Sequence, residues 1–379
     1  MTSQLITDLD GIGEIEDEWR ALAELRGNAF VTPEWFRSWE GKRPDSTTPL
    51  VAAARREDGS LAGVMPLVLD ATKRPRAIRF GGANFGDRFV PAAREADEEA
   101  VVSAAMTALQ EEGMDRYMLL LDHVDQGRPW WREMQRASRV QRTGIEQQQW
   151  DVAYIDFNGL DGWEEYLASR SRNFRSQIRR RERALRNEHR VEVRSATEAT
   201  LRDDLAQLFD LHDRRWQGRE QSSSLQISGA KPALSRFAEL AQRRGWLRLR
   251  LLDVDGEPVA GFLGWRLGEV YAFYQSGFDP DWAEKSVGVV MMATTVRSAL
   301  EERAAEFDML LGDEPYKQRF TNASRPVHTV ILPKSISPTR LLVAGEARAR
   351  RVGRRLAERP ALGRALRSMT RRLPTARRN

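Results

Sequence analysis

Apolar side chains recur at every third or fourth position in seven stretches of the chain, which is the spacing of helices with one buried face. Within residues 14–26, for example, Ile15 and Trp19 follow this spacing. Asp161 and Glu164 have the spacing of a capping box, so we expect a helix to begin there. The pattern predicts helices over residues 14–26, from residue 32, and over 98–112, 161–187, 200–216, 234–244 and 289–305.

Shorter apolar or alternating runs, bounded by turn residues, predict strands between these helices. The run at residues 117–122 is apolar up to its last residue, Asp122, as in a strand buried on both faces. The predicted strands cover residues 50–55, 62–69, 76–81, 117–122, 151–157, 246–254, 259–267, 270–276, 307–311 and 327–332.

The order of elements repeats along the chain, which indicates an internal duplication. The strand pair at residues 50–69 has the same Asp-Gly turn and Ala-Gly start as the pair at 247–267. The helix at 98–112 and the apolar strand after it are matched by the helix at 289–305 and its following strand. The sequence therefore predicts an α/β fold with mixed (α+β) sheets, divided into domains at residues 1–150 and 151–335 and a tail at 336–379.

The composition excludes several kinds of site. The chain has no cysteine, so disulfides, thiolate-bound metals and a cysteine nucleophile are excluded. The four histidines show no metal-ligand spacing, so we expect no metal. We find no signal-like start and no apolar stretch long enough to span a membrane, and therefore expect a cytoplasmic protein.

The positive charge is concentrated in the tail. Residues 340–379 hold 13 Arg and two Glu, whereas the rest of the chain has 47 Lys and Arg against 53 Asp and Glu. Leu362, Leu366 and Met369 repeat at helical spacing among the arginines. A basic amphipathic helix is typical of peripheral contact with a membrane, here its inner face, and a disordered tail is the alternative.

Several segments resemble the CelD-like or BioF-like branch of the GNAT acyltransferases, which occurs in tandem form and is related to the Fem aminoacyltransferases. The resembling segments are residues 211–216, 255–261, 274–280, 286–288 and 307–317, with Pro33-Glu34-Trp35 and Met65-Pro66-Leu67 in the first half. The resemblance covers most of residues 15–332. It implies tandem GNAT-like domains followed by a basic helical tail.

The predicted donor site is the helix start at Ser286, Val287, Gly288 and Val289. A helix N-terminus offers unpaired N–H groups to an anion, and the resemblance implies that this one holds the pyrophosphate of acyl-CoA, the co-substrate. Lys285 lies beside it and can pair with phosphate. The alternative is an ordinary serine cap next to a surface lysine.

The predicted catalytic residues follow the strand at residues 307–311. Acyl transfer to an amine needs a base, an oxyanion stabiliser and an acid for the leaving thiolate. Asp313 or Glu314 can act as the base, Tyr316 as the acid and Lys317 as the oxyanion stabiliser. The alternative is a proline-containing turn with solvated charges.

The predicted substrate-binding residues are Gln275, Tyr274, Trp216 and Arg175. Arg175 belongs to a segment, residues 170–194, that holds ten arginines and can bind acidic groups of a substrate or form a solvated helix face. Aromatic residues for base stacking are nearly absent from it, so we expect no nucleic-acid binding. The first half has no counterpart of the donor motif, so we expect it to lack a cofactor and to shape the acceptor cleft.

These expectations combine into one function. We expect an N-acyltransferase that moves an acyl group from acyl-CoA directly to an amine, on an amino sugar or a cell-envelope or exopolysaccharide precursor. One alternative is a Fem-like transferase that uses aminoacyl-tRNA. The other is a non-catalytic GNAT scaffold in polysaccharide production.

Overall fold

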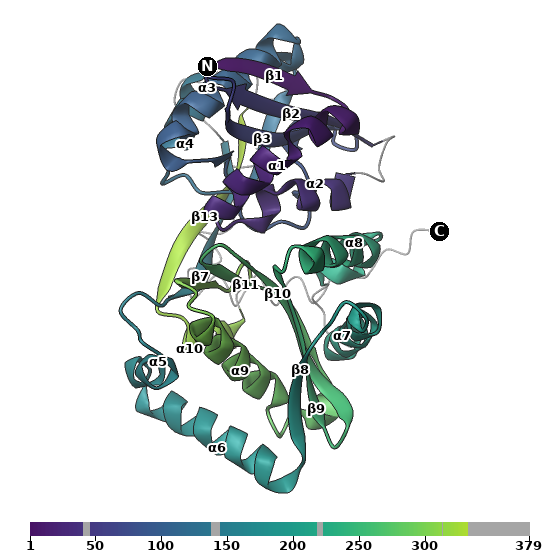
Figure 1. Cartoon of the computed structure of the whole chain (residues 1–379), viewed down its shortest axis with the longest axis vertical. Coiled ribbons are helices and arrows are strands. Elements are labelled where there is room, and N and C mark those ends of the chain that lie inside the picture. Colours follow the sequence, from purple (N-terminus) through teal and green to yellow (C-terminus); the bar gives the residue numbers. More distant parts are fainter. Residues whose placement is uncertain (41–45, 138–144, 218–222, 313, 333–379) are drawn as a thin grey trace, which may run out of the picture.

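The structure, a computed structural model, describes residues 1–40, 46–137, 145–217, 223–312 and 314–332. The predicted tail helix and Asp313 lie outside these residues. Figure 1 shows two lobes, one built mainly from residues before β7 and one from residues after it, with β13 reaching from the second into the first.

One continuous mixed sheet runs through both lobes in the order β1-β2-β3-β4-β6-β13-β7-β12-β11-β10-β9-β8, with β5 paired to β3. The strands are β1 (Thr2–Ile6), β2 (Thr47–Arg55), β3 (Leu61–Asp70), β4 (Ala77–Phe80), β5 (Ala92–Ala93), β6 (Met118–Val124), β7 (Ile145–Asp156), β8 (Val191–Ser195), β9 (Leu247–Val254), β10 (Glu257–Leu267), β11 (Val270–Phe278), β12 (Glu306–Asp308) and β13 (Ala323–Leu332).

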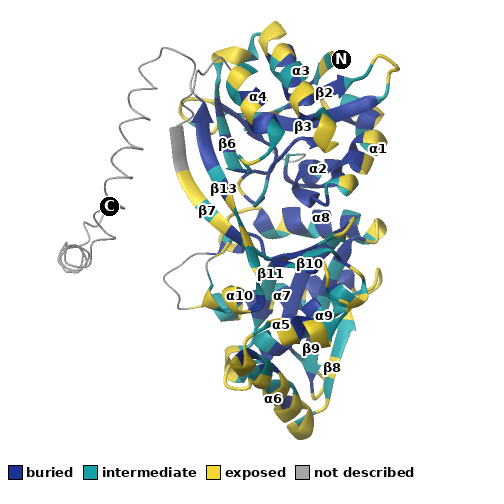
Figure 2. Cartoon of the chain, turned by 90° about the vertical axis from the view of Figure 1, so that its left-hand side faces the viewer, coloured by how far each residue is buried: buried dark blue, intermediate teal, exposed yellow. Residues whose placement is uncertain are grey.

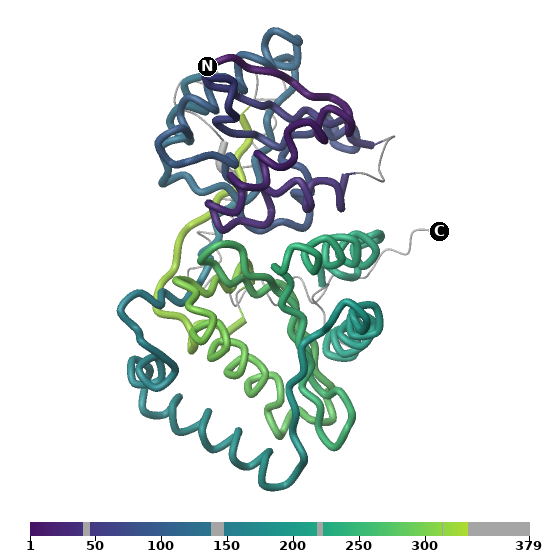
Figure 3. The backbone as a smooth tube through the Cα atoms, viewed as in Figure 1, coloured from purple at the N-terminus to yellow at the C-terminus, as the bar shows by residue number. Residues whose placement is uncertain are grey.

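The centre of the sheet is a strand exchange between the lobes. β7, which ends the first lobe, pairs with β12 of the second, and β13, which ends the second lobe, pairs with β6 of the first. β7 and β13 also pair with each other, antiparallel. Figure 3 shows the yellow end of the described chain running alongside the first lobe. The predicted domain boundary at residue 150 falls inside β7, and the division at 150 and 335 stays a prediction.

Ten helices of the described chain cover the sheet. They are α1 (Leu9–Leu25), α2 (Pro33–Glu40), α3 (Glu98–Glu111), α4 (Pro129–Ala137), α5 (Trp163–Ser169), α6 (Arg172–Glu188), α7 (Leu201–Trp216), α8 (Ala230–Arg243), α9 (Val287–Glu301) and α10 (Pro315–Phe320). In the second lobe, side chains of β10 alternate between two cores: Leu263 and Trp265 pack with α7 and α8, and Phe262 packs with α6 and α9.

An aromatic cluster joins the lobes. Trp35 of α2 is fully buried and lies 5.0 Å from the ring of Phe237 on α8 and 5.8 Å from that of Tyr274 on β11. Phe30 makes an edge contact with Trp265 at 5.5 Å. Because these rings come from both lobes, their burial stabilises the two lobes as one body.

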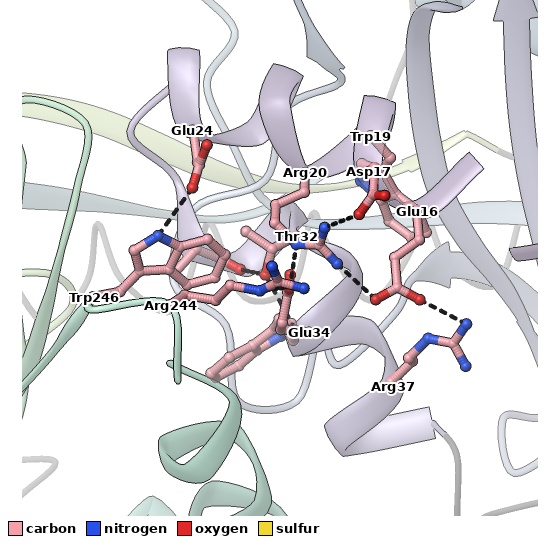
Figure 4. Close-up of polar contacts among 12 residues, drawn as sticks. Glu16, Asp17, Trp19, Arg20, Glu24, Thr32, Glu34, Arg37, Arg244 and Trp246 are labelled. Carbon is pink, nitrogen blue, oxygen red and sulfur yellow. Dashed lines mark hydrogen bonds and ion pairs between the residues drawn. The ribbon is translucent and has the colours of Figure 1, made fainter. Parts of the chain in front are cut away.

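A polar cluster lies at the same interface and adds contacts between the lobes (Figure 4). Glu34 of α2 is buried and pairs with Arg20 of α1 and, at 3.2 Å, with Arg244 after α8. The indole N–H of Trp246 donates to Glu24 at 3.0 Å. Each contact but the first links the first lobe to the second.

The structure corrects several predicted elements. The helix expected over residues 161–187 is two helices, because the hydroxyl of Ser171 accepts the N–H of Phe174 and starts α6 afresh. The expected capping box is wrong: Glu165, not Glu164, accepts the N–H of Asp161. The pattern missed β1, β5, β8, α4 and α10, and the strand expected to reach residue 311 ends at Asp308.

The aromatic cluster allows a test of whether the lobes unfold together. Replacing Trp35 with alanine removes ring contacts to both lobes and should lower the free energy of unfolding by about 3–5 kcal/mol, in a single transition. Urea denaturation followed by circular dichroism measures this. Leu25→Ala, at a side chain that is 61% exposed, serves as the control and should change stability by less than about 0.5 kcal/mol. Two separate transitions, with only one shifted by the Trp35 variant, would contradict the interlocked fold.

Candidate functional site

A pocket of about 180 Å³ opens beside the start of α9. β11 pairs with β12 only from Val270 to Ala272, because β12 ends at Asp308; β11 continues to Phe278 with no described strand on that side. The pocket adjoins the unpaired part of β11. It is lined by Arg215, Gly261, Phe262, Phe273, Ser276, Gly277, Phe278, Ala283, Ser286, Val287, Gly288, Val289, Met291, Met292 and Tyr316.

The start of α9 leaves donors unpaired at this pocket. Ser286 has a left-handed backbone (φ 59°) and its side chain makes no capping hydrogen bond. The N–H groups of Val289 and Val290 turn back to the carbonyl of Ser286. Within the described chain, no partner is recorded for the N–H groups of Val287 and Gly288. The ordinary serine cap considered above is therefore not what the structure shows, and an anion would find two free N–H groups.

Lys285 lies away from the pocket lining. Its ammonium group pairs with the carboxylate of Glu188 on α6. The hydrogen bond from Lys285 and its positive charge lower the pKa of Glu188. The predicted pairing of Lys285 with phosphate would have to break this ion pair.

Tyr316 of α10 contributes its phenol to the pocket wall. Burial, reinforced by the charge of Glu314, raises the pKa of Tyr316 to about 12, although Arg215 and Ser276 act in the opposite direction. The phenol therefore stays protonated at neutral pH and can donate a proton.

A second pocket, of about 350 Å³, lies between the lobes, and we call it the inter-lobe pocket. Its lining is Asn84, Phe85, Asp87, Arg215, Trp216, Ser223, Ser224, Phe273, Tyr274, Gln275, Ser276, Leu311, Gly312, Glu314 and Lys317. It shares Arg215, Phe273 and Ser276 with the pocket at α9. The guanidinium of Arg215 donates to the hydroxyl of Ser276 at 2.7 Å, so these two side chains form the boundary between the pockets.

Glu314 and Lys317 lie together in the inter-lobe pocket. Lys317 is almost fully buried; its ammonium group donates to the carbonyl of Leu311 at 2.8 Å and lies 3.0 Å from Oε2 of Glu314. This buried ion pair differs from the solvated turn considered as the alternative. It also means that Glu314 already has a cationic partner within the pocket.

The predicted substrate residues divide into two places. Gln275, Tyr274 and Trp216 line the inter-lobe pocket, where Gln275 donates to Ser224 (3.1 Å) and the Tyr274 hydroxyl donates to the carbonyl of Phe85 (3.0 Å). Arg175 lines neither pocket. It lies on α6 and donates to the carbonyls of Ala168 and Arg170, at the end of α5.

Sequence reasoning missed three residues that line the inter-lobe pocket. Asp87 and Asn84 come from the irregular segment between β4 and β5, where no motif marks them, and only the resemblance of residues 211–216 could have indicated Arg215. His212 is buried, and one of its ring nitrogens lies 2.9 Å from the hydroxyl of Ser223. Burial lowers the pKa of His212 to about 4, so its ring is neutral at physiological pH.

In the first lobe, α3 occupies the place that α9 has in the second. Its first residue, Glu98, is fully buried and lies 3.1 Å from Arg26 and 2.9 Å from Arg128. The buried carboxylate and its two arginine partners occupy this helix start, where a pyrophosphate would otherwise bind. The absence of a cofactor from this lobe stays a prediction, which this geometry favours.

The described residues contain no group of three His, Asp or Glu placed to hold a metal ion. None of the described helices is long and apolar enough to cross a membrane.

Comparison with known proteins agrees with this architecture. The acetyltransferase (GNAT) domain family matches residues 172–318. FemX has the same fold over 91% of this chain and 100% of its own, at 12% identity and a TM-score of 0.63. The chain is also similar to the C-terminal domain (DUF2156) of a putative lysylphosphatidylglycerol synthetase from Agrobacterium fabrum. That match covers 87% of this chain and 95% of the domain, at 12% identity and a TM-score of 0.55.

A match to L-PGS from Bacillus licheniformis covers 88% of this chain and 96% of the L-PGS chain, at 13% identity and a TM-score of 0.50. No curated protein sequence matches the chain significantly. The expected fold class, an α/β chain with a mixed sheet, is confirmed, and its second half matches the GNAT domain family.

The buried His212 predicts a dependence of stability on pH. Its pKa falls from an ordinary 6.5 to about 4 on folding, so between these values the unfolded chain binds more protons. Stability should therefore fall as the pH drops from 7 to 4, by about 3 kcal/mol from this residue. Urea unfolding at a series of pH values should show a shallower decline for His212→Gln than for the wild type. Equal slopes for both proteins would contradict the assignment.

Proposed function

We propose that the protein transfers an acyl group from acyl-CoA, bound at α9, to an amine bound in the inter-lobe pocket, because residues 172–318 match the acetyltransferase (GNAT) domain family. The observation that carries this proposal is the contact of the two pockets at Arg215 and Ser276. A thioester at this boundary would lie within reach of a nucleophile from the other side, and such placement is a large part of catalysis in bimolecular reactions.

The donor half of the proposal rests on the start of α9. The free N–H groups of Val287 and Gly288 suit the pyrophosphate of the donor. Apolar side chains of the same pocket, among them Phe278 and Met291, suit the pantetheine arm and the acyl chain. Lys285 takes part only if it leaves Glu188.

The catalytic half follows from the boundary residues. Attack of the amine on the thioester creates an oxyanion, which the cationic Arg215 can stabilise from the shared wall. Tyr316, protonated at neutral pH, can give its proton to the leaving thiolate. Lys317 and Glu314 hold the chain after β12 in place through the buried ion pair, and Lys317 adds positive charge to the oxyanion's surroundings.

The acceptor proposed for the inter-lobe pocket is an amine on an amino sugar or a cell-envelope precursor. Asn84, Gln275 and Ser224 offer polar groups for sugar hydroxyls, and Trp216 offers a ring face. A cytoplasmic protein whose residues 340–379 contact the inner membrane face would meet such precursors where they are assembled.

A second candidate is transfer from aminoacyl-tRNA. A groove of about 690 Å³ on the outer face of α6 favours it, because five arginines line this groove: Arg172, Arg175, Arg179, Arg180 and Arg183. Figure 2 shows this face of α6 exposed at the end of the second lobe. Binding of tRNA that weakens steeply with salt and with Arg180→Glu would support this candidate.

Isothermal titration with acetyl-CoA tests the donor site. The Cβ of a residue at position 288 would lie 3.1 Å from the ring of Phe278, so Gly288→Leu should fill the pocket and weaken binding more than tenfold. Gly162→Leu is the matched control: Gly162 also starts a helix but has no atom near its Cβ position, and its variant should bind as the wild type does. No binding of acetyl-CoA by the wild type at millimolar concentration would refute the acyl-CoA proposal.

A further inference from the structure

Asp87 brings a carboxylate from the first lobe into the inter-lobe pocket. It belongs to the segment between β4 and β5, and it lines the pocket opposite residues that follow β12, among them Glu314 and Lys317. Its Oδ2 accepts the N–H of Leu311 at 3.2 Å. This bond crosses the lobe interface and holds the carboxylate in place.

The other carboxylates nearby are occupied by cations. Glu314 is paired with Lys317, and the buried Asp308 lies 3.5 Å from both Arg88 and Arg325. For Asp87 the described residues record no ion pair, and no hydrogen bond to Oδ1. Asp87 is thus the carboxylate of the pocket that is oriented by a backbone bond and still has an oxygen available to a substrate.

We infer that Asp87 is the general base that removes the proton from the acceptor amine, an assignment that rests on the acyl transfer proposed above. The ammonium group R–NH₃⁺ gives one proton to Oδ1 of Asp87, and the freed lone pair forms the C–N bond to the thioester carbon. As the C–S bond breaks, Tyr316 gives its phenolic proton to the leaving thiolate, and the nitrogen loses a second proton, which restores the phenol. The products are the amide, free CoA and protonated Asp87, which returns its proton to water.

The surroundings of Asp87 suit a base. Desolvation by the surrounding protein raises the pKa of Asp87, and the negative charge of Asp308 on β12 adds to this effect. His123 on β6, the N–H of Leu311 and Lys317 on α10 lower the pKa and so act in the opposite direction. A carboxylate with a raised pKa takes a proton more readily than an exposed one. The rate should accordingly rise with pH as Asp87 ionises, and this limb of the profile should vanish in Asp87→Asn.

With Asp87 as the base, the first lobe contributes a catalytic residue to the site. Its own helix start, at Glu98, is closed by a carboxylate, yet through Asp87 the lobe supplies a reacting group to the site of the second lobe. Neither lobe would then form a complete active site without the other.

Two small amines as acceptor probes separate a base from a merely structural residue. With acetyl-CoA as donor, release of free CoA is followed for methylamine, which is protonated at neutral pH, and for hydroxylamine, which is largely unprotonated. Asp87→Asn keeps an acceptor for the N–H of Leu311. It should lower kcat with methylamine at least 100-fold, lower kcat with hydroxylamine less than threefold, and leave the Kd of acetyl-CoA unchanged.

Asp125→Asn is the matched control, because Asp125 is also an aspartate of the first lobe that accepts a backbone N–H, from Gly127 at 2.9 Å; this variant should behave as the wild type. Equal losses with both amines, or no loss with either, would overturn the role of Asp87 while leaving the acyltransferase proposal in place. A wild-type protein that releases no CoA with either amine would overturn both.

Discussion

The pairing of β7 with β13 runs antiparallel from Tyr154 opposite Ala323 to Ile145 opposite Ile331, and each of the two strands lies next to a strand of the opposite lobe. An isolated sheet edge is a row of unpaired N–H and C=O groups. Here β13 pairs with the edge of β6 and β7 pairs with the edge of β12, so the N–H and C=O groups of both edges find partners. The two lobes therefore share a ladder of backbone hydrogen bonds. The aromatic cluster around Trp35 and the Glu34 charge cluster only complete an interface that the sheet already imposes.

The position of both pockets follows from that sheet. β12 is only three residues long, and the chain leaves the sheet after Asp308. This exit opens the space beside β11 in which the start of α9 lies, and it carries Glu314, Tyr316 and Lys317 to the lobe interface. The proposed donor and acceptor sites are therefore two sides of one gap in the strand pairing.

Periodicity was sufficient for most interior elements, because their apolar positions face a core. It failed for β1 and β8, the two outermost strands, which are only five residues long and only partly buried, so that each offers few apolar positions. Glu314, Tyr316 and Lys317 could be named from the sequence because they follow a buried strand in a segment that resembles a known family. Asp87 could not: its bond to Leu311 joins residues more than 200 positions apart, and nothing local to either residue indicates the contact.

The strand exchange also has a consequence for how the chain is made. β6 is synthesised about two hundred residues before its partner β13, since Leu121 pairs with Val330. During translation the edge of β6 therefore stays unpaired until β13 has been synthesised, and an unpaired edge can pair with other chains. Contacts of such large sequence separation slow folding, and we expect the rate of maturation in the cell to depend on chaperones that shield the edge of β6 until the last strand arrives.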